Sequence, residues 1–372
     1  MLVLSFFLNY CIKYNIMFNI CYTGVKQTRK GDGFMGIISV DFGHNSVKAA
    51  TDVKDPIMIP SILTSNVKDI ELSNLADYNP LDYLRVDVGG DEYMVGNLAR
   101  KQSRLVIHNI NDDDISTKET QILMLAAVGY LAANKEEINL CTDLPVTHYQ
   151  KMKDDIKQVF TKDDVFRMKY YDYTTGFYEK KNFSIEEVDV KPQGFYALMD
   201  LILNKAGEIK PEMEKLASGL TVTIDIGFYS TDIYIAEGLH PRMFFPEKPI
   251  PGMAEAYRII NADISSHFDV RKELHQLEEG VLKKELKIKG KNYDITDSVE
   301  KAYKFLTKKI ISEMKNNIPF TNDVDTFLLS GGGALALEDY FNKHIKGLKV
   351  IPNPQYANAN GGLKWGQRTF KG

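Results

Sequence analysis

Residues 40–48 read VDFGHNSVK, and residues 224–232 repeat the design as IDIGFYSTD. In each stretch an aspartate ends an apolar run, a glycine follows two positions later, and polar residues lead into the next apolar run. A glycine between two such runs indicates a tight turn, so residues 36–41 with 46–51, and residues 221–236, are each predicted to form a β-hairpin. The recurrence predicts an α/β protein with two related halves, each a sheet with helices on its faces.

The rest of the chain after Met35 alternates between strand and helix patterns. Further strands are predicted at residues 92–95, 138–142, 170–178, 183–190 and 325–330. Helices are predicted at residues 117–134, 195–204, 253–268, 298–317 and 338–345. A polar stretch at residues 208–219 precedes the second hairpin, and we place a domain boundary there.

A third glycine-rich stretch, residues 327–334, reads FLLSGGGA. Here a predicted strand runs directly into Gly331, Gly332 and Gly333, and a helix is expected to follow. Adjacent glycines permit backbone conformations and a close ligand approach that a Cβ would forbid. The N-terminus of the following helix would favour a phosphate group or a nucleotide. A flexible loop between strand and helix is the alternative.

The first hairpin has side chains suited to an anion and its counter-ion. Turn amides without bulky side chains can form a concave anion site. Asp41 is placed to hold Mg²⁺ through water, since Mg²⁺ keeps much of its hydration, and Lys48 can neutralise phosphate charge. An ordinary turn is the alternative at either hairpin. In the second hairpin, however, Asp232 begins an apolar strand, where a carboxylate is unusual for packing alone.

Composition limits the class of protein. The 372 residues are 44% hydrophobic and 26% charged, which supports ample cores, most simply in two domains. A disordered chain and a disulfide-stapled mini-protein are excluded. The net charge of −4, from 46 basic and 50 acidic side chains, gives no sign of a sequence-independent nucleic-acid binder. The basic run at residues 283–291 could touch DNA or an adaptor, but an exposed, solvated run is the favoured interpretation.

Residues 1–34 differ from the remainder: they are rich in Phe, Ile, Asn and Tyr, with Asp32 their single carboxylate. A secretory signal fits badly, because no basic residue precedes the apolar run and no small-x-small cleavage site follows. A membrane helix fits badly too, because polar residues interrupt the stretch (Asn9, Lys13, Asn15 and Asn19).

Two readings of this extension stay open, a genuine tail and upstream sequence translated in frame. Codons for Lys30, Gly31 and Asp32 can contain a bacterial ribosome-binding sequence shortly before Met35, which would then be the true start. A peptide spanning Lys30 to Met35 in the native protein would exclude this hypothesis. Cys11 and Cys21 lie in the extension, so the core from Met35 keeps Cys141 alone, which fits a reducing cytoplasm.

Together the three stretches resemble the phosphate 1, phosphate 2 and adenosine motifs of the actin-like ATPase superfamily, which includes actins, heat-shock 70-type chaperones and sugar kinases. No Walker-type GxxxxGK[ST] is present. The resemblance implies an actin-like, ribonuclease H-like fold with a nucleotide cleft between two halves. It implies domain I at residues 35–207, completed by residues 353–372, and domain II at residues 208–352.

The resemblance also implies roles for individual residues. Asp41 and Asp225 would flank Mg²⁺, Lys48 would reach the phosphates, and Asp232 would belong to the catalytic group. The nucleotide-binding residues would be Gly43, His44, Asn45, Gly227, Ser230, Thr231, Gly331, Gly332 and Gly333. A small hydroxyl residue is commoner in the family at His44, so Asn45 or Ser46 would replace its phosphate contact.

Gln193 is the remaining catalytic candidate. Residues 190–194 read VKPQG and lie at a strand end before the predicted helix at residues 195–204. In the family this connection carries a Gln or Glu that positions the attacking water. A glutamine is no strong base, but orienting water suits phosphoryl transfer, where positioning and electrostatics dominate. A plain polar residue at a helix N-terminus is the alternative.

Four short segments resemble the bacterial plasmid-segregating, ParM-like actins, and they extend the resemblance from Met35 to about Lys364. They are IMIPS at residues 57–61, YMVGNLA at residues 93–99, TDLPV at residues 142–146 and YANANG at residues 356–361. In the third, Asp143 replaces the usual glycine.

The resemblance implies a cytoplasmic ATPase that uses ATP and Mg²⁺ and polymerises with its own copies. It would move plasmid DNA through a DNA-binding adaptor bound to the plasmid centromere, without touching nucleic acid or membrane itself. A small-molecule kinase is the first rival, although it would need an acidic base where Gln193 lies. A non-segregating, shape-determining or chaperone-like homologue is the second.

Overall fold

The computed structural model describes residues 35–67, 79–102, 107–108, 117–242, 249–318 and 321–371. The N-terminal extension, residues 1–34, lies outside the described residues, so the two readings of it stay open. No helix in the described part of the chain is long and apolar enough to cross a membrane.

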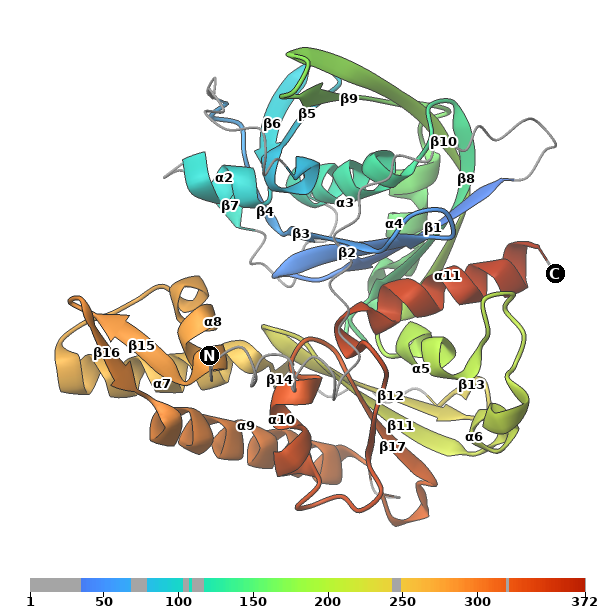
Figure 1. The fold of residues 1–372 in the computed structure, drawn as a ribbon. Coiled ribbons are helices and arrows are strands. Elements are labelled where there is room, and N and C mark those ends of the chain that lie inside the picture. The colour runs from blue at the N-terminus through green and yellow to red at the C-terminus, as the bar shows by residue number, and fades with distance from the viewer. Residues whose placement is uncertain are drawn as a thin grey trace, which may run out of the picture. The chain divides into compact units, whose positions relative to one another are not determined.

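The first sheet contains ten of the described strands, in the order β3-β2-β1-β8-β10-β9-β5-β6-β4-β7 (Figure 1). Their bounds are β1 Gly36–Phe42, β2 Ser46–Thr51, β3 Ile57–Pro60, β4 Ile62–Thr64, β5 Leu84–Val88, β6 Asp91–Val95, β7 Ile107–His108, β8 Glu136–Leu144, β9 Phe166–Asp172 and β10 Phe177–Pro192. β1 pairs antiparallel with β2 and parallel with β8, and β8 pairs parallel with β10. The carboxyl ends of β1, β8 and β10 therefore meet at one edge of the sheet.

The second sheet repeats this plan with β11 in the place of β1. Its order is β13-β12-β11-β17-β18, and β14 pairs with β12. The bounds are β11 Leu220–Ile226, β12 Ser230–Glu237, β13 His240–Pro241, β14 Ile250–Pro251, β17 Thr326–Ser330 and β18 Lys349–Val350. β11 pairs antiparallel with β12 and parallel with β17. The predicted α/β architecture with two related sheets is confirmed.

The helices of the described residues are α2 Asn97–Gln102, α3 Lys118–Leu131, α4 Tyr149–Thr161, α5 Phe195–Ile202, α6 Glu214–Ser218, α7 Met253–Phe268, α8 Leu274–Lys283, α9 Thr296–Asn317, α10 Ala334–Phe341 and α11 Ala357–Phe370. Short 3-10 turns lie at Pro80–Tyr83, Pro211–Met213, Thr321–Asp323 and Pro354–Tyr356, and β15 (Glu285–Ile288) forms a hairpin with β16 (Lys291–Asp294). α3 begins where Thr117 caps it, as its side chain accepts from the Thr120 N–H.

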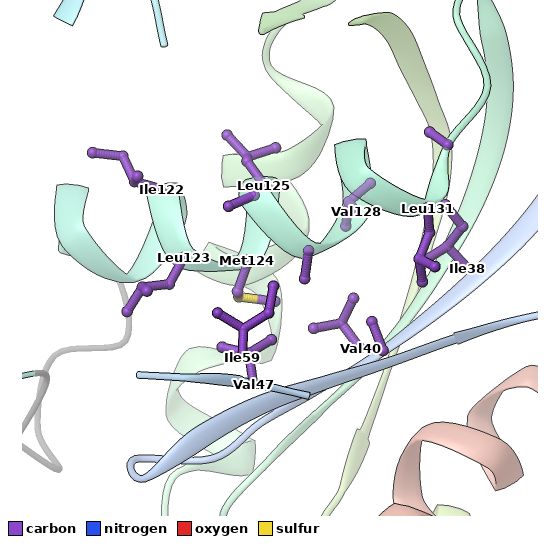
Figure 2. Packing of buried hydrophobic residues seen from close by; sticks show 14 of the residues in the cluster. Ile38, Val40, Val47, Ile59, Ile122, Leu123, Met124, Leu125, Val128 and Leu131 are labelled. Atoms are coloured by element: carbon purple, nitrogen blue, oxygen red, sulfur yellow. The ribbon is translucent and has the colours of Figure 1, made fainter. Parts of the chain in front are cut away.

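α3 covers one face of the first sheet because, after its polar first turn, its residues from Ile122 to Leu131 are almost all apolar. Figure 2 shows Met124 of α3 directed towards Val47 and Ile59 of β2 and β3, with Val40 of β1 close by. These side chains are almost completely buried. Burial of each large apolar side chain of this kind stabilises the fold by about 1.5–3 kcal/mol. This packing fixes the strand that ends at the first aspartate motif.

α11 packs against α5 and against β1 and β8, close to the site described below (Figure 1). A Cβ on Gly361 of α11 would lie 1.6 Å from the carbonyl oxygen of Tyr196 in α5, so only glycine permits this approach. A buried cluster around α5 includes Cys141 of the first sheet together with Tyr234 and Leu328 of the second. α5 and α11 therefore hold the sheet edges that carry the motifs.

Two predicted elements are wrong in their bounds. Residues 170–178 do not form one strand, because a turn separates β9 from β10 there: the Asp172 carboxylate accepts from the Thr174 N–H, and Gly176 has a φ of 74°. The helix predicted at residues 338–345 instead begins at Ala334, immediately after the glycines. The sequence patterns also missed α4, α8 and the β15–β16 hairpin, which contains most of the basic run at residues 283–291.

Candidate active site

The first aspartate motif lies in the turn between β1 and β2. Asp41 is the second-to-last residue of β1 and is 4% exposed. The Lys48 ammonium on β2 donates to its Oδ2 at 3.0 Å. The turn itself is closed by a hydrogen bond from the Gly43 N–H to the Ser46 carbonyl oxygen at 3.2 Å. Lysine and aspartate thus meet at the mouth of a four-residue turn.

The second aspartate motif has the same turn. Asp225 is next to the last residue of β11, and the Gly227 N–H donates to the Ser230 carbonyl oxygen at 2.9 Å. A Cβ on Gly43 or on Gly227 would lie 2.8 Å from the serine carbonyl oxygen of its turn. The spacing of aspartate, glycine and serine is therefore set by the turn geometry itself.

The three glycines lie directly beside the second motif because β17 pairs in parallel with β11, with Ser330 opposite Asp225. Gly331 has a φ of 83°, and a Cβ there would lie 2.4 Å from Asp225 Oδ1. The Gly333 N–H donates to the Ile226 carbonyl oxygen at 3.0 Å, and α10 begins at the next residue. Gly331 is thus required both for the turn and for the approach to Asp225.

Gln193 comes from the other sheet. It follows the last residue of β10, and its backbone N–H donates to the Leu144 carbonyl oxygen at 2.7 Å. Gly194, next in the chain, has a φ of 87° and is the N-cap residue of α5. The backbone of Gln193 is therefore held at the edge where β1, β8 and β10 end, and both Gln193 and Asp41 line the cavity described next.

One cavity brings these motifs together. Among its lining residues are nearly all the residues singled out in the sequence: Asp41, Gly43, His44, Asn45, Ser46, Lys48, Gln193, Asp225, Gly227, Ser230, Asp232, Gly331, Gly332 and Gly333. They come from both sheets, and they include two backbone turns, one glycine loop, one lysine and three carboxylates. A polar ligand with several anionic groups fits this combination.

Thr231 is the exception. Its side chain is 3% exposed, and its hydroxyl donates to the Pro251 carbonyl oxygen at 2.9 Å. It holds β14 against β12 and does not line the cavity. The Thr231 hydroxyl is therefore not available as a ligand-binding group in this arrangement, whereas the adjacent Ser230 is part of the lining.

The electrostatics of the cavity are dominated by buried charges. Burial by itself would lower the pKa of the Lys48 ammonium, but the Asp41 carboxylate outweighs this effect and raises that pKa above its ordinary value. Burial raises the pKa of Asp225 to about 6, and the negative charge of Asp41 contributes to the rise. Lysine thus stays charged, while Asp225 is held ionised at neutral pH only at an energetic cost.

Asp143, at the end of β8, lies near these groups but outside the cavity lining. Neither of its oxygens makes a hydrogen bond of ordinary geometry, although the Gln193 amide is near enough to favour its charged form. Burial raises the pKa of Asp143 well above its usual range, and the Asp41 and Asp225 carboxylates raise it further. Three carboxylates therefore surround one lysine, and negative charge exceeds positive charge among these four groups.

This excess of carboxylate is what a divalent cation would neutralise. Asp41 and Asp225 supply hard oxygen ligands of the kind that Mg²⁺ prefers. Among the residues that the structure describes, no three acidic, histidine or cysteine side chains converge as direct ligands. The donor set therefore fits Mg²⁺ held largely through water, and it does not fit an ion that needs a complete cage of protein ligands.

The sequence patterns assigned no role to several further residues that line the cavity. They lie on helices α7, α8, α9, α10 and α11 or just before them: Met253, Tyr257, Glu278, Leu282, Tyr303, Ala336, Gln355 and Asn358. No local motif marks these positions, because each residue lies on an amphipathic helix or just before one, where its neighbours in the chain form an ordinary helical pattern. Asn358 alone had a signal, as it lies within the YANANG segment.

Two family models match consecutive parts of the chain. The model described as "Actin like proteins N terminal domain" matches residues 39–195. The model described as "Archaeal actin homologue MreB-like, C-terminal" matches residues 223–343. Together they cover about three quarters of the chain. No curated protein matches the chain at significant similarity.

Solved structures share the fold over most of the chain. A non-polymerisable quadruple mutant of pCBH ParM is 23% identical with a TM-score of 0.72, covering 90% of this chain and 100% of its own. A 15-stranded ParM filament from Clostridium botulinum is 23% identical with a TM-score of 0.75, and the match covers 90% of this chain and 99% of the other. Ta0583, an archaeal actin homologue in complex with ADP, is 17% identical with a TM-score of 0.71, and the match covers 90% of this chain and 100% of the other. At these identities the likeness is one of fold.

Proposed function

The chain belongs to the actin-like proteins, and we propose that it binds ATP with Mg²⁺ and hydrolyses the nucleotide as its copies assemble into and leave a filament. The observation that carries this proposal is the single cavity lined by both aspartate hairpins, the glycine loop and Gln193. Each feature occurs alone in many proteins, but their convergence from two sheets supports a polyphosphate ligand.

The proposed site divides by chemistry. Phosphate oxygens would be bound by the backbone of Gly43, His44, Asn45 and Gly227, with Lys48 neutralising their charge. The nucleoside would lie along the glycine loop, with Ser230 on the phosphate side. Asp41 and Asp225 would hold Mg²⁺ through water, and the ion would neutralise charge on the phosphates when bound.

Gln193 would orient the water that attacks the terminal phosphate, and Asp232 would complete the catalytic group. Because an amide both donates and accepts hydrogen bonds, the Gln193 side chain can fix a water without removing its proton. Phosphoryl transfer has a loose transition state, so positioning and charge stabilisation supply most of the rate. The place of Gln193 at the end of β10, opposite the second hairpin, supports this role.

Assembly follows from contacts to both halves. We propose domain I at residues 35–207 with 353–372, and domain II at residues 208–352, so that a nucleotide in the cavity touches both. Binding would then favour a closed arrangement by hinge motion. Heterologous contacts that do not close into a ring produce an open helical filament, which hydrolysis can weaken.

For the cellular role we propose plasmid segregation in the cytoplasm, through a DNA-binding adaptor on the plasmid centromere. The four short segments that resemble ParM-like actins support this role, as do the structural neighbours that carry that name. The acidic net charge of −4 supports an indirect link to DNA. A pull-down with the purified chain that recovers a protein bound to plasmid DNA tests this part.

Sedimentation tests the proposal as a whole. The full chain is incubated with Mg²⁺ and ATP, ADP or a non-hydrolysable ATP analogue, then pelleted while phosphate release is followed. We expect pelleting with ATP that declines as phosphate appears, and persistent pellets with the analogue. Phosphate transfer to an added metabolite without pelleting would instead identify a small-molecule kinase.

A further inference from the structure

We propose that Asn358 of α11 is a positioning residue that ties Asp225 in one sheet to the turn beside Gln193 in the other, so that α11 couples the metal-binding carboxylate to the water-orienting glutamine. This inference rests on the proposed function, because it concerns the same cavity. It assigns a role to a side chain that touches neither the phosphates nor the attacking water in that scheme.

Asn358 makes three hydrogen bonds from a side chain that is 5% exposed. Its Nδ2 donates to Asp225 Oδ2 at 2.5 Å. Its Oδ1 accepts from the backbone N–H groups of Gly194 at 3.3 Å and of Ala197 at 3.0 Å. Since backbone N–H groups can only donate and a carboxylate only accepts, the partners fix which way the amide faces.

The bonds to Gly194 and Ala197 supply a missing helix cap. Gly194 is the N-cap residue of α5 and has no side chain to satisfy the free N–H groups of the first turn. A side chain is excluded there, because a Cβ on Gly194 would lie 2.7 Å from Cβ of Tyr234. Asn358 provides the capping oxygen from another helix. It therefore fixes the position of the first turn of α5 and of Gln193, which comes just before the N-cap residue.

The bond to Asp225 acts on the opposite side of the cavity. Asp225 is buried, and the Asn358 amide is one of the groups that favour its charged form. A fixed donor at 2.5 Å from Oδ2 also restricts the rotation of the carboxylate, which leaves its orientation towards the cavity set. One amide thus sets both the carboxylate that would hold Mg²⁺ and the turn that carries Gln193.

Neighbouring contacts make α11 a firm support for this amide. The Lys364 ammonium donates to Asp200 Oδ1 at 2.6 Å, at the other end of α5. The Trp365 indole N–H donates to Asp189 Oδ2 at 2.8 Å, on β10 just before Gln193. α11 is therefore bound to the chain on both sides of Gln193, at Asp189 before it and at Asp200 after it. Trp365, the single tryptophan of the sequence, lies within this arrangement.

The test compares Asn358→Ala with Asn360→Ala, which removes an amide from the same helix outside the cavity. For Asn358→Ala we expect kcat for phosphate release to fall about 10–100-fold, as for other groups that orient a metal ligand. The Mg²⁺ concentration for half-maximal rate should rise, and the affinity for ADP in EDTA should stay at the wild-type value. Asn360→Ala should match the wild type throughout.

Two further measurements separate positioning from loosening of the fold. Because Asn358 acts in part through Gln193, the double variant Asn358→Ala/Gln193→Ala should be far less impaired than the product of the single effects. Asn358→Asp keeps the oxygen that caps α5 and loses the donor to Asp225, so it should also raise the Mg²⁺ requirement; it serves if the alanine variant does not fold. The proposal would be overturned if the double variant showed the product of the two single losses in rate. It would also be overturned if neither Asn358→Ala nor Asn358→Asp changed the Mg²⁺ requirement.

Trp365 fluorescence provides a readout that needs no hydrolysis. Addition of Mg²⁺ to the ADP-bound wild type should change the Trp365 emission, and Asn358→Ala should lose most of that change. Equal changes in both proteins would contradict the coupling. If the wild type releases no phosphate from ATP, the proposed function fails, whereas the fluorescence comparison still decides whether Asn358 joins the two sides of the cavity.

Discussion

Asp232 Oδ1 accepts a hydrogen bond from the backbone N–H of Val146 at 2.7 Å, and both residues are buried. Asp232 lies near the start of β12 in the second sheet, while Val146 follows β8 of the first. The bond therefore crosses between the two sheets at the edge of the cavity. It gives Asp232 a structural role in addition to the catalytic one implied by the sequence resemblance.

Variants of Asp232 should separate these two roles. Asp232→Ala leaves the buried Val146 N–H without its charged acceptor, so we expect a loss of about 1.5–3 kcal/mol in the free energy of unfolding. Asp232→Asn keeps an oxygen for this bond and should lose less. Phosphate release should fall in both variants. Full activity of a stable Asp232→Asn protein would reduce Asp232 to a structural residue.

Gln193→Ala should slow ATP hydrolysis about 100-fold with little loss of nucleotide affinity, because the change removes the group that orients the water and leaves the phosphate-binding turns intact. Stopped assays of phosphate release and titration with a fluorescent nucleotide measure the two quantities. Gln158→Ala, an exposed position on α4, is the matched control. Unchanged hydrolysis by assembled Gln193→Ala protein would remove the assignment.

Asp225→Asn should stabilise the nucleotide-free protein in EDTA while it abolishes Mg²⁺-dependent activity. The folded-state pKa of Asp225 is about 6, above the ordinary value of 3.8, so the folded protein holds this proton more tightly than the unfolded chain. The ionised carboxylate therefore costs about 3 kcal/mol at pH 7.5, and this cost disappears as the pH falls from 6 towards about 4.

Thermal melts across this pH range test the sign. The variant should exceed the wild type at pH 7.5, and the difference should vanish near pH 4. Asp155→Asn, at an exposed position on α4, should show no such pH-dependent gain. A variant that is less stable than the wild type at pH 7.5 would show that burial does not dominate the energetics of Asp225.

The fold was predictable from local chemistry where a single turn decides the structure. Asp41 and Asp225 each end an apolar run two residues before a glycine, and this spacing alone predicted both hairpins and their relation. The actin-like fold implied by the resemblance is confirmed. The strand at residues 170–178 was wrong because the Asp172 side chain closes a turn inside an aromatic run, a competing local bond that strand patterns ignore.

The site was only half predictable, for a physical reason. Residues on the turns carry their own local signature. Asn358 reaches Asp225, 133 residues away in the chain, because the close contact of Gly361 with Tyr196 holds α11 against α5. Likewise, Thr231 carries a hydroxyl of the kind that binds phosphate, and it lies within the second motif. The pairing of β12 with β14 nevertheless directs this hydroxyl to the Pro251 carbonyl oxygen. Such placements depend on tertiary packing.

Gly361→Ala should test that packing. The new Cβ would lie 1.6 Å from the Tyr196 carbonyl oxygen, a backbone atom that cannot yield as a flexible side chain can. Separating α11 from α5 should cost about 3 kcal/mol of unfolding free energy. Gly332→Ala is the stability control, because its nearest atoms, in Gln355, are 3.9 Å away. Equal denaturant midpoints for the two variants would contradict the close approach.

The central claim, that this cavity hydrolyses ATP, is tested most directly by phosphate release from ATP and Mg²⁺ with the full chain and its Asp41→Asn variant side by side. Asp41→Asn keeps the shape of the side chain and removes the charge that would hold the ion and pair with Lys48. We predict steady phosphate release by the wild type and a fall of at least about 100-fold in the variant. No release by the wild type, or equal release by both proteins, would contradict the account.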